Sequence, residues 1–305
     1  MLCGVLAVVL LSACARTAIP TTPPVVITVS GSSAMAPLLT RLAARFQQQQ
    51  TSIVVAVDPR DSALGLADVI AGRVALAAVS VAPPEDMWAA PIAVDGIAIV
   101  VHPDNPLPGL TLAQLHDVFS GRVWQWHELG VMVAGDEIQV ISREEGSGTR
   151  RSFEALAMRA DLSALIGCPP ARLPDPAGDA AQLTATPATA CALDPVTTMA
   201  LVVMDSQSVI DTVSGHPGAI GYVSRAYAGS QVKVLSIEGV PPDPERTYGA
   251  SPLGQAGASP LYALTQPFFL VAPQEPTGAA RSFVDFCLSP QGQAIVAEHY
   301  APVRR

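Results

Sequence analysis

Two turns rich in glycine and serine limit the possible folds of this chain most. Each lies between a strand-like and a helix-like segment. The first, residues 31–37 (Gly-Ser-Ser-Ala-Met-Ala-Pro), links the β-branched run 25–29 to apolar residues with helical spacing over 38–46. The second, residues 146–149 (Gly-Ser-Gly-Thr), links the alternating run 138–141 to helical spacing over 153–160. Each pattern predicts a strand, a tight turn and a helix. Because the first turn of a helix leaves N–H groups free, each turn also predicts converging donors.

Such converging donors attract anions. The helix dipole adds about half a positive charge, Ser147 and Thr149 add hydroxyl donors, and Arg143 comes from the preceding strand. Taken alone, the second turn is more typical of an ordinary capped helix start with Thr149 as N-cap. The repetition of the pattern favours two anion-facing helix ends. If these ends lie in separate lobes, they can close on an oxyanion.

Composition supports two lobes and argues against nucleic acid as a partner. The chain has 305 residues, of which 50% are hydrophobic and only 14% are charged, so it can bury one large core or two moderate ones. The net charge is -9 and Lys233 is the one lysine, whereas nucleic-acid binding relies on dense Lys and Arg. We therefore expect any anion to be held by local donors and dipoles rather than by a basic surface.

The N-terminal residues predict export and a lipid anchor. Residues 2–13 form an uncharged apolar run that is shorter than the roughly 20 residues of a membrane span, as in the core of a signal peptide, although no Lys or Arg precedes it. Residues 11–14 (Leu-Ser-Ala-Cys) resemble a bacterial lipobox with Cys14 as the lipidated residue, and a Pro-rich tether follows to residue 24. In an oxidising compartment a disulfide between Cys168 and Cys191 is then expected, and Cys287 is expected to be a buried free thiol.

The order of segments predicts an α/β fold whose ligand lies at the carboxyl ends of strands. Strands over 25–29, 53–57 and 74–79 alternate with two helices, which implies a parallel sheet with right-handed crossovers. In such open sheets ligands bind beyond the carboxyl ends of the strands. Ser33, Ser62 and Ser80 all fall there.

Two later strands are predicted to join the lobes. Residues 96–101 cross to the second lobe, residues 261–271 cross back, and helices over 278–288 and 289–299 close the first lobe. The predicted division is a signal peptide over 1–13, a tether over 14–24, a first lobe over 25–101 plus 265–305, and a second lobe over 102–264.

Five segments together resemble the PstS-like phosphate-binding lipoproteins of bacterial ABC transporters, a type II branch of the periplasmic-binding-protein superfamily. The segments occur in the family order and are residues 31–38, 118–126, 143–150, 218–224 and 283–293. The resemblance implies a two-lobed fold with two hinge crossings that closes on a dehydrated oxyanion. It also implies a monomer that delivers phosphate to a membrane permease without a cofactor or metal, held outside the cytoplasm by its lipid anchor.

The resemblance assigns residues to the ligand. Ser33, the Ala34 amide and Ser62 are first-lobe donors, Glu145 orients the arginine, and the second-lobe donors are Arg143, Ser147, Gly148 and Thr149. At the end of the third strand, however, Ser80 is followed by Val81 where the family often has Asp or Arg, and an aspartate there distinguishes hydrogen phosphate from sulfate. Asp61 is an extra carboxylate that either accepts the ligand's proton instead or weakens anion binding. Sulfate, molybdate and tungstate therefore stay alternatives to phosphate.

Two other classes of function are alternatives to a transport receptor. An enzyme is not favoured, because the chain has no Gly-x-Ser-x-Gly elbow, the Gly-Ser-Gly-Thr turn lacks the lysine of a P-loop, and the five histidines have no metal-ligand spacing. A sensor or surface lipoprotein that no longer transports is the other alternative, and it draws on the departures at Asp61 and Val81.

Overall fold

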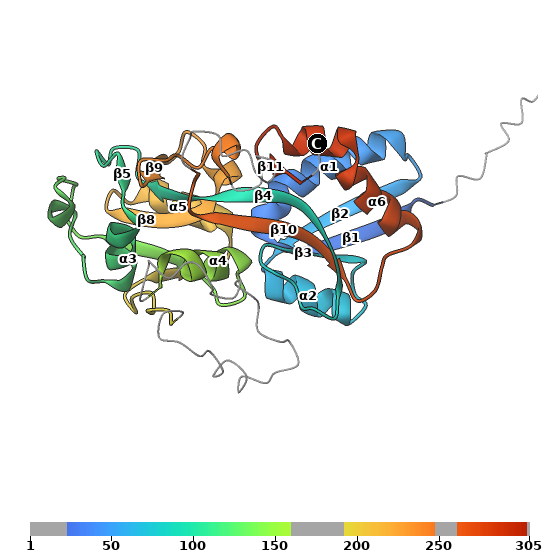
Figure 1. Cartoon of the computed structure of the whole chain (residues 1–305), viewed down its shortest axis with the longest axis horizontal. Coiled ribbons are helices and arrows are strands. Elements are labelled where there is room, and N and C mark those ends of the chain that lie inside the picture. Colours follow the sequence, from blue (N-terminus) through green and yellow to red (C-terminus); the bar gives the residue numbers. More distant parts are fainter. Residues whose placement is uncertain (1–22, 160–191, 248–260, 304–305) are drawn as a thin grey trace, which may run out of the picture.

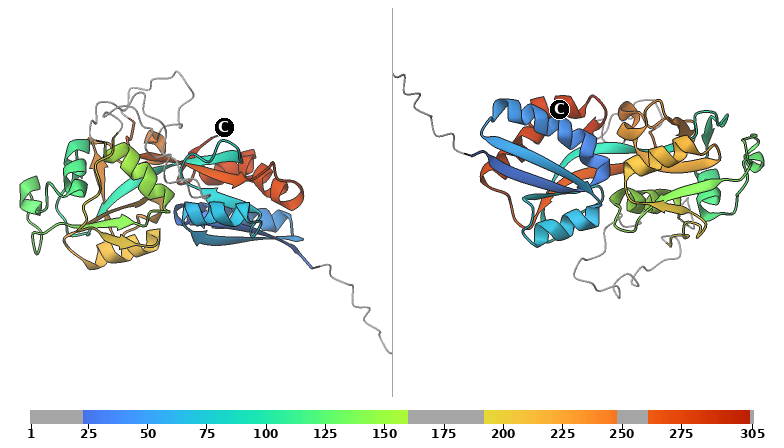
Figure 2. Two further views of the ribbon diagram at one scale, coloured as in Figure 1. Left: turned by 90° about the horizontal axis from the view of Figure 1, so that it is seen from below. Right: turned by 180° about the vertical axis from the view of Figure 1, so that it is seen from behind.

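The chain forms two lobes that lie side by side, with two long strands running from one to the other (Figure 1). The computed structural model describes residues 23–159, 192–247 and 261–303. Both lobes combine sheet with covering helices, and the two further views show the same division (Figure 2). Within the described ranges, no helix is long and apolar enough to cross a membrane. The α/β, two-lobed fold with two crossings is thus as predicted.

The first lobe is built on three parallel strands in the order β2-β1-β3. Its leading elements are β1 (Val25–Ser32), the short 3-10 helix η1 (Ser33–Met35), α1 (Ala36–Gln49), β2 (Ile53–Arg60), α2 (Ser62–Ile70) and β3 (Leu76–Val79). This confirms the predicted alternation of strands and helices. Strand β2 continues past residue 57, where we expected a turn, because Asp58 to Arg60 still pair with the end of β1.

The core of the first lobe joins the start of the chain to its end. Helix α1 buries Leu38, Leu42 and Phe46, and the ring of Phe46 lies 5.4 Å from that of Phe283 in α6 (Gly278–Leu288). Helix α7 (Pro290–Val296) and strand β11 (Ala301–Pro302) complete this lobe. Ser289 caps α7, and Cys287 is a buried free thiol, as predicted.

Two antiparallel strands cross between the lobes: β4 (Trp88–Val101) and β10 (Thr265–Ala272). Strand β4 begins eight residues before the predicted start at 96 and pairs with β10 over its first part, then with β8 from Ile97 onward. Ile97, Ile99 and Val101 belong to a different apolar cluster from Ile92 and Ala93, so the chain passes from one core to the other within β4. The residue boundaries that we predicted for the lobes stay a prediction.

The second lobe continues the sheet with β8, β6 and β7 and covers it with helices. Its elements are β5 (Gly109–Leu110), α3 (Leu112–Ser120), the 3-10 helix η2 (Trp126–Leu129), β6 (Gln139–Arg143), α4 (Gly148–Ala157), β7 (Leu201–Val203), α5 (Ser206–Gly215), β8 (Ala219–Ser224), η6 (Arg225–Tyr227), β9 (Lys233–Ile237) and η7 (Pro244–Arg246). Trp126 is buried and its Nε1 donates to the Gly218 carbonyl, whereas Trp124 is exposed. Trp126 is therefore part of the core of this lobe, and Trp124 is not.

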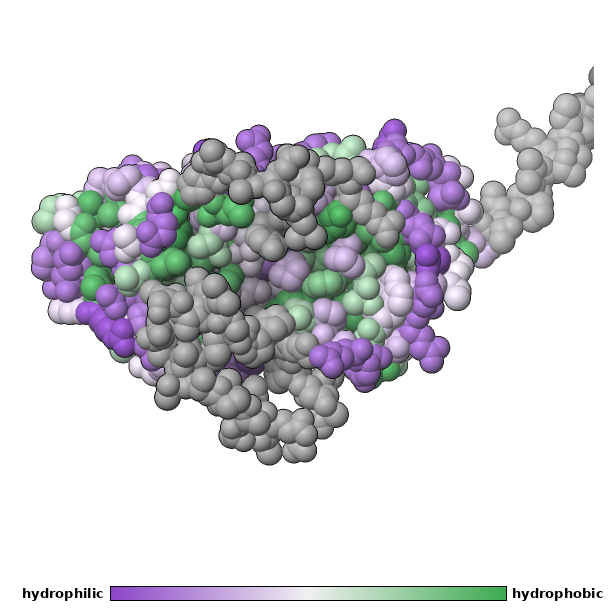
Figure 3. Space-filling model, viewed as in Figure 1, coloured by the Kyte–Doolittle hydropathy of each residue, from purple (hydrophilic) through white to green (hydrophobic). Residues whose placement is uncertain are grey.

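Charged side chains lie mainly toward the outside of the molecule. On the face drawn in Figure 3, hydrophilic residues gather along the outer edges, whereas apolar and weakly polar residues are frequent near the middle.

Candidate anion-binding site between the two lobes

The first-lobe side of the site consists of serines at the carboxyl end of the parallel strands. Ser32 ends β1, Ser62 begins α2 and Ser80 follows β3. The Ser32 hydroxyl donates to Ser80 Oγ at 2.9 Å, and the hydroxyls of Ser62 and Ser80 lie 3.4 Å apart. All three are buried. Sequence analysis placed Ser62 and Ser80 here but missed Ser32, whose side chain joins this cluster.

Close backbone packing places α2 on this edge. A Cβ at Gly65 would come within 2.5 Å of the Ser30 carbonyl oxygen and the Gly31 Cα, so the first turn of α2 can lie on β1 only because Gly65 has no side chain. Asp61 caps the helix, since its Oδ1 accepts from the Leu64 N–H at 2.6 Å. Asp61 is nearly buried and is therefore part of the site's wall.

The second-lobe side is the turn between β6 and α4. Ser147, rather than Thr149, is the N-cap, because its Oγ accepts from the Arg150 N–H at 3.2 Å. The amides of Gly148 and Thr149 are in the first turn of α4, where N–H groups have no acceptor within the helix. Ser147, Gly148 and Thr149 are all buried. The positive end of the helix dipole is thus buried, and away from water it acts more strongly on an anion.

Arg143 is held by Glu144 in this structure, whereas the orienting role predicted for Glu145 stays a prediction. The Arg143 Nε and Nη2 donate to the two carboxylate oxygens of Glu144 at 3.0 and 2.8 Å. The Ser147 N–H donates to the Glu144 carbonyl at 3.1 Å, which closes a tight turn. Glu145 lies at the outer corner of that turn and its side chain is exposed. Turn geometry, which the motif position does not reveal, therefore selects the neighbouring glutamate.

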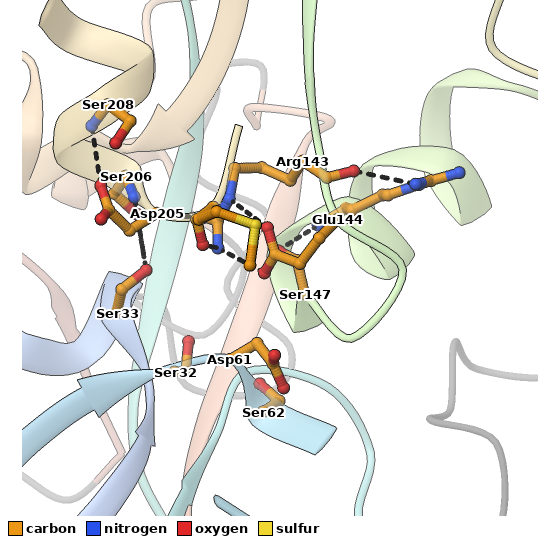
Figure 4. A network of polar contacts seen from close by, with 12 residues as sticks. Ser32, Ser33, Asp61, Ser62, Arg143, Glu144, Ser147, Asp205, Ser206 and Ser208 are labelled. Atoms are coloured by element: carbon orange, nitrogen blue, oxygen red, sulfur yellow. Dashed lines mark hydrogen bonds and ion pairs between the residues drawn. The ribbon is translucent and has the colours of Figure 1, made fainter. Parts of the chain in front are cut away.

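The two sides meet directly. A Cβ at Gly148 would lie 2.4 Å from Ser80 Oγ and 2.5 Å from Ser62 Oγ, so the α4 turn rests against the first-lobe hydroxyls. The Ala63 N–H donates to the Gly146 carbonyl at 3.2 Å, and the Ser152 hydroxyl donates to the Ser80 carbonyl at 3.1 Å. In Figure 4, Ser32, Asp61 and Ser62 lie opposite Arg143, Glu144 and Ser147. The second predicted turn therefore faces the first lobe, where its direct contacts are with the start of α2 and the end of β3 rather than with the turn 31–37.

Helix α5 is a further neighbour that sequence analysis missed. Ser33, which we expected to face the ligand, has its Oγ 3.2 Å from Ser206 Oγ, and its carbonyl accepts from the Tyr227 hydroxyl at 2.8 Å. Ala34 is buried in the adjoining turn. The residues 205–206 (Asp-Ser), just before apolar residues with helical spacing, are a capping signal that could have identified a third helix start.

Buried partners also hold the strand that carries Arg143. The Tyr222 hydroxyl accepts from the Arg143 N–H at 3.2 Å and lies 3.0 Å from Ser142 Oγ, and burial raises the pKa of Tyr222 to about 12. Tyr222 therefore stays neutral and fixes β6 without adding charge to the site.

Other predicted residues do not enter this geometry. Among the described residues, no group of His, Cys, Asp and Glu could hold a metal ion. Cys14, Cys168 and Cys191 lie outside the described residues, as do the predicted signal peptide and most of the tether.

Comparison with known proteins gives the family. A family model described as PBP superfamily domain matches residues 18–291. The phosphate-binding protein PstS of Bacillus subtilis is 28% identical over 287 residues, which cover 91% of this chain and 80% of that protein. PstS of Pseudomonas aeruginosa is 26% identical over 233 residues, which cover 70% of this chain and 60% of that protein.

Solved structures agree with that match. A protein described as a phosphate ABC transporter substrate-binding protein with bound phosphate, from Clostridium perfringens, has a TM-score of 0.71 and 26% identity and covers 92% of this chain and 100% of its own. An ABC-type phosphate transport receptor from Vibrio cholerae has a TM-score of 0.60 and 25% identity, with 91% and 100% covered. Since the family model spans most of the residues and the two-lobed fold agrees with it, this chain belongs to the PBP superfamily.

Proposed function

We propose that this protein is an extracytoplasmic receptor that captures inorganic phosphate between its two lobes and delivers it to an ABC permease. The observation that carries the proposal is the direct apposition of the α4 turn and the first-lobe serines, with Gly148 against Ser62 and Ser80. The relatives named above are phosphate-binding proteins, which supports phosphate as the ligand. The predicted lipid anchor at Cys14, a monomeric state and a non-enzymatic role are parts of the same proposal.

The donors suit a small oxyanion. A serine hydroxyl can donate one hydrogen bond, so hydroxyls that now bond one another can turn toward an anion. Arg143 adds a cation whose guanidinium is already oriented by Glu144. Charge-assisted hydrogen bonds are each worth about 1.5 to 3 kcal/mol, so several together offset the desolvation of a small anion.

Calorimetry with phosphate, sulfate, molybdate and tungstate tests the proposal. We expect the wild-type protein to bind phosphate and the Arg143→Ala, Thr149→Ala double variant to lose measurable binding. Arg281→Ala is the matched control, because this arginine pairs with Asp285 and Glu275 on α6 and its loop, away from the site. If the double variant bound phosphate as tightly as the wild type, the α4 turn would not be part of the anion-binding site.

One observation favours a different oxyanion. The side chain next to Ser80 is Val81, and its Cγ1 would lie 2.9 Å from a Cβ at Gly148, so an apolar group faces the α4 turn there. An apolar group cannot accept the proton of hydrogen phosphate. If the panel shows sulfate, molybdate or tungstate bound more tightly than phosphate, the receptor serves that anion instead.

A further inference from the structure

Ser206, the first residue of α5, occupies a fully buried position between groups of both lobes. Asp205 precedes it as the N-cap, with its Oδ1 accepting from the Ser208 N–H at 2.7 Å, so the start of the helix is well defined. Ser206 has no exposed surface. Figure 4 shows it between Ser33 on one side and the strand of Arg143 on the other.

Ser206 contacts two of the predicted ligand residues at once. The Arg143 Nη1 donates to Ser206 Oγ at 3.4 Å, and the two serine hydroxyl oxygens of Ser33 and Ser206 lie 3.2 Å apart. In addition, the Ser206 N–H donates to Ser33 Oγ at 3.4 Å. Ser206 therefore connects a first-lobe hydroxyl to the second-lobe arginine.

Either serine hydroxyl can donate to the other, and a bound anion that accepts from Ser33 selects the arrangement in which Ser206 donates. A guanidinium can only donate, so Ser206 Oγ accepts from Arg143 and its own proton is available for Ser33 Oγ. Ser33 Oγ then accepts from both the N–H and the hydroxyl of Ser206, which fills its two lone pairs. In this arrangement the one proton of Ser33 is available to a bound anion.

The same count applies to Arg143. Among its five N–H groups, Nε and one of Nη2 bond Glu144, the other of Nη2 donates to the Met204 carbonyl at 3.0 Å, and one of Nη1 donates to Ser206. The described contacts therefore leave one N–H of Nη1, on the atom that also contacts Ser206.

We propose that Ser206 is a positioning residue of the anion site, which orients the free proton of Ser33 and the remaining N–H of Arg143 toward one bound oxyanion. The inference rests on the proposed function. It adds α5 as a third element of the site, acting through the other two rather than as an anion ligand. In the arrangement described here, Ser206 joins Ser33 of the first lobe to Arg143 of the second.

The test is titration calorimetry with inorganic phosphate, combined with thermal unfolding without phosphate. We expect Ser206→Ala to weaken phosphate binding about tenfold or more, because one directed hydrogen bond is lost at each of two ligand residues. The unfolding midpoint should change little. Ser206→Thr keeps the hydroxyl and should bind close to wild type, and Ser208→Ala, on the same helix turn, is the matched control.

A double-mutant cycle separates positioning from a merely structural role. If Ser206 acts partly through Ser33, Ser206→Ala should cost less affinity in the Ser33→Ala background than in the wild type, because only its effect on Arg143 remains. Additive losses, or wild-type affinity in Ser206→Ala, would overturn the inference. If the wild-type protein binds none of phosphate, sulfate and molybdate, the proposed function fails and the inference fails with it, whereas wild-type binding with an unchanged Ser206→Ala variant refutes the inference alone.

Discussion

Asp61 adds a carboxylate to the first-lobe wall of this site. It caps α2 and lies against the opposite lobe, because a Cβ at Gly146 would come within 2.7 Å of its Cγ and Oδ1. An anion bound between the lobes therefore meets a fixed negative charge on one wall. Such a charge repels fully ionised sulfate, whereas hydrogen phosphate can offer it a proton.

Replacing Asp61 with Asn should lower the preference for phosphate over sulfate. Asparagine keeps an oxygen that can cap α2 and removes the charge. We therefore expect sulfate affinity to rise about tenfold relative to phosphate affinity, a change that corresponds to the energy of roughly one charge-assisted hydrogen bond. The ratio of the two affinities, measured by calorimetry, is the readout. Asp86→Asn, at an exposed position, is the control. An unchanged ratio would mean that Asp61 only caps its helix.

At the scale of elements, the two crossing strands share a buried acid. Asp95 of β4 is opposite Gln266 of β10, whose Nε2 donates to Asp95 Oδ2 at 2.8 Å. Burial raises the pKa of Asp95 to about 7, although hydrogen bonds from Gln266, Ser224 and the neighbouring backbone lower it. The strands that join the lobes therefore carry a group that titrates near neutral pH.

The free energy of unfolding should fall as the pH rises through this range. Between about pH 4 and pH 7 the native carboxyl of Asp95 keeps a proton that the unfolded chain has lost, so its contribution to stability decreases with pH and levels off above pH 7. The change is a few kcal/mol at most, since one pKa unit corresponds to about 1.4 kcal/mol. Urea unfolding at pH 5 and pH 8 measures it. Asp95→Asn should flatten the difference, and an equal difference in both proteins would contradict this account.

At the scale of the whole molecule, closure depends on how near the lobes can approach. The turn of α4 touches Ser62 and Ser80 because residue 148 is glycine, and a methyl group there would overlap both hydroxyl oxygens. Ser152 and Gly146 add hydrogen bonds across the same boundary. The first turn of α4 thus sets the limit of lobe closure.

Gly148→Ala should hold the lobes apart without unfolding them. The backbone of residue 148 is helical, so alanine fits locally, and the added Cβ acts only across the boundary. Because the added Cβ overlaps the hydroxyls of Ser62 and Ser80, we expect phosphate affinity to fall about tenfold or more. Small-angle scattering with phosphate should show a larger radius of gyration than for the wild type. Gly215→Ala is the control, since nothing lies within 4 Å of its added Cβ. If phosphate gave Gly148→Ala the same radius of gyration as the wild type, lobe closure would tolerate the added methyl group.

Much of the local structure could be predicted because it depends on neighbouring residues. The serine- and glycine-rich turns, the alternation of β1, α1, β2, α2 and β3, and the cap at Ser289 all follow from periodicity and capping chemistry over a few positions. Only residues 96–101 of β4 were predicted as a strand. The earlier residues gain their strand conformation by pairing with β10, which lies far along the chain.

The sequence by itself determined where the helix starts lie and which residue types they present, because capping and turn formation are local. Only the tertiary structure decided which of these starts face one another. Ser33 meets Ser206 across 173 positions of sequence, and Arg143 takes Glu144 rather than Glu145 because a tight turn directs one side chain inward and the other outward. Contacts of this range depend on how two separately formed lobes pack together, and no pattern of neighbouring residues specifies that packing.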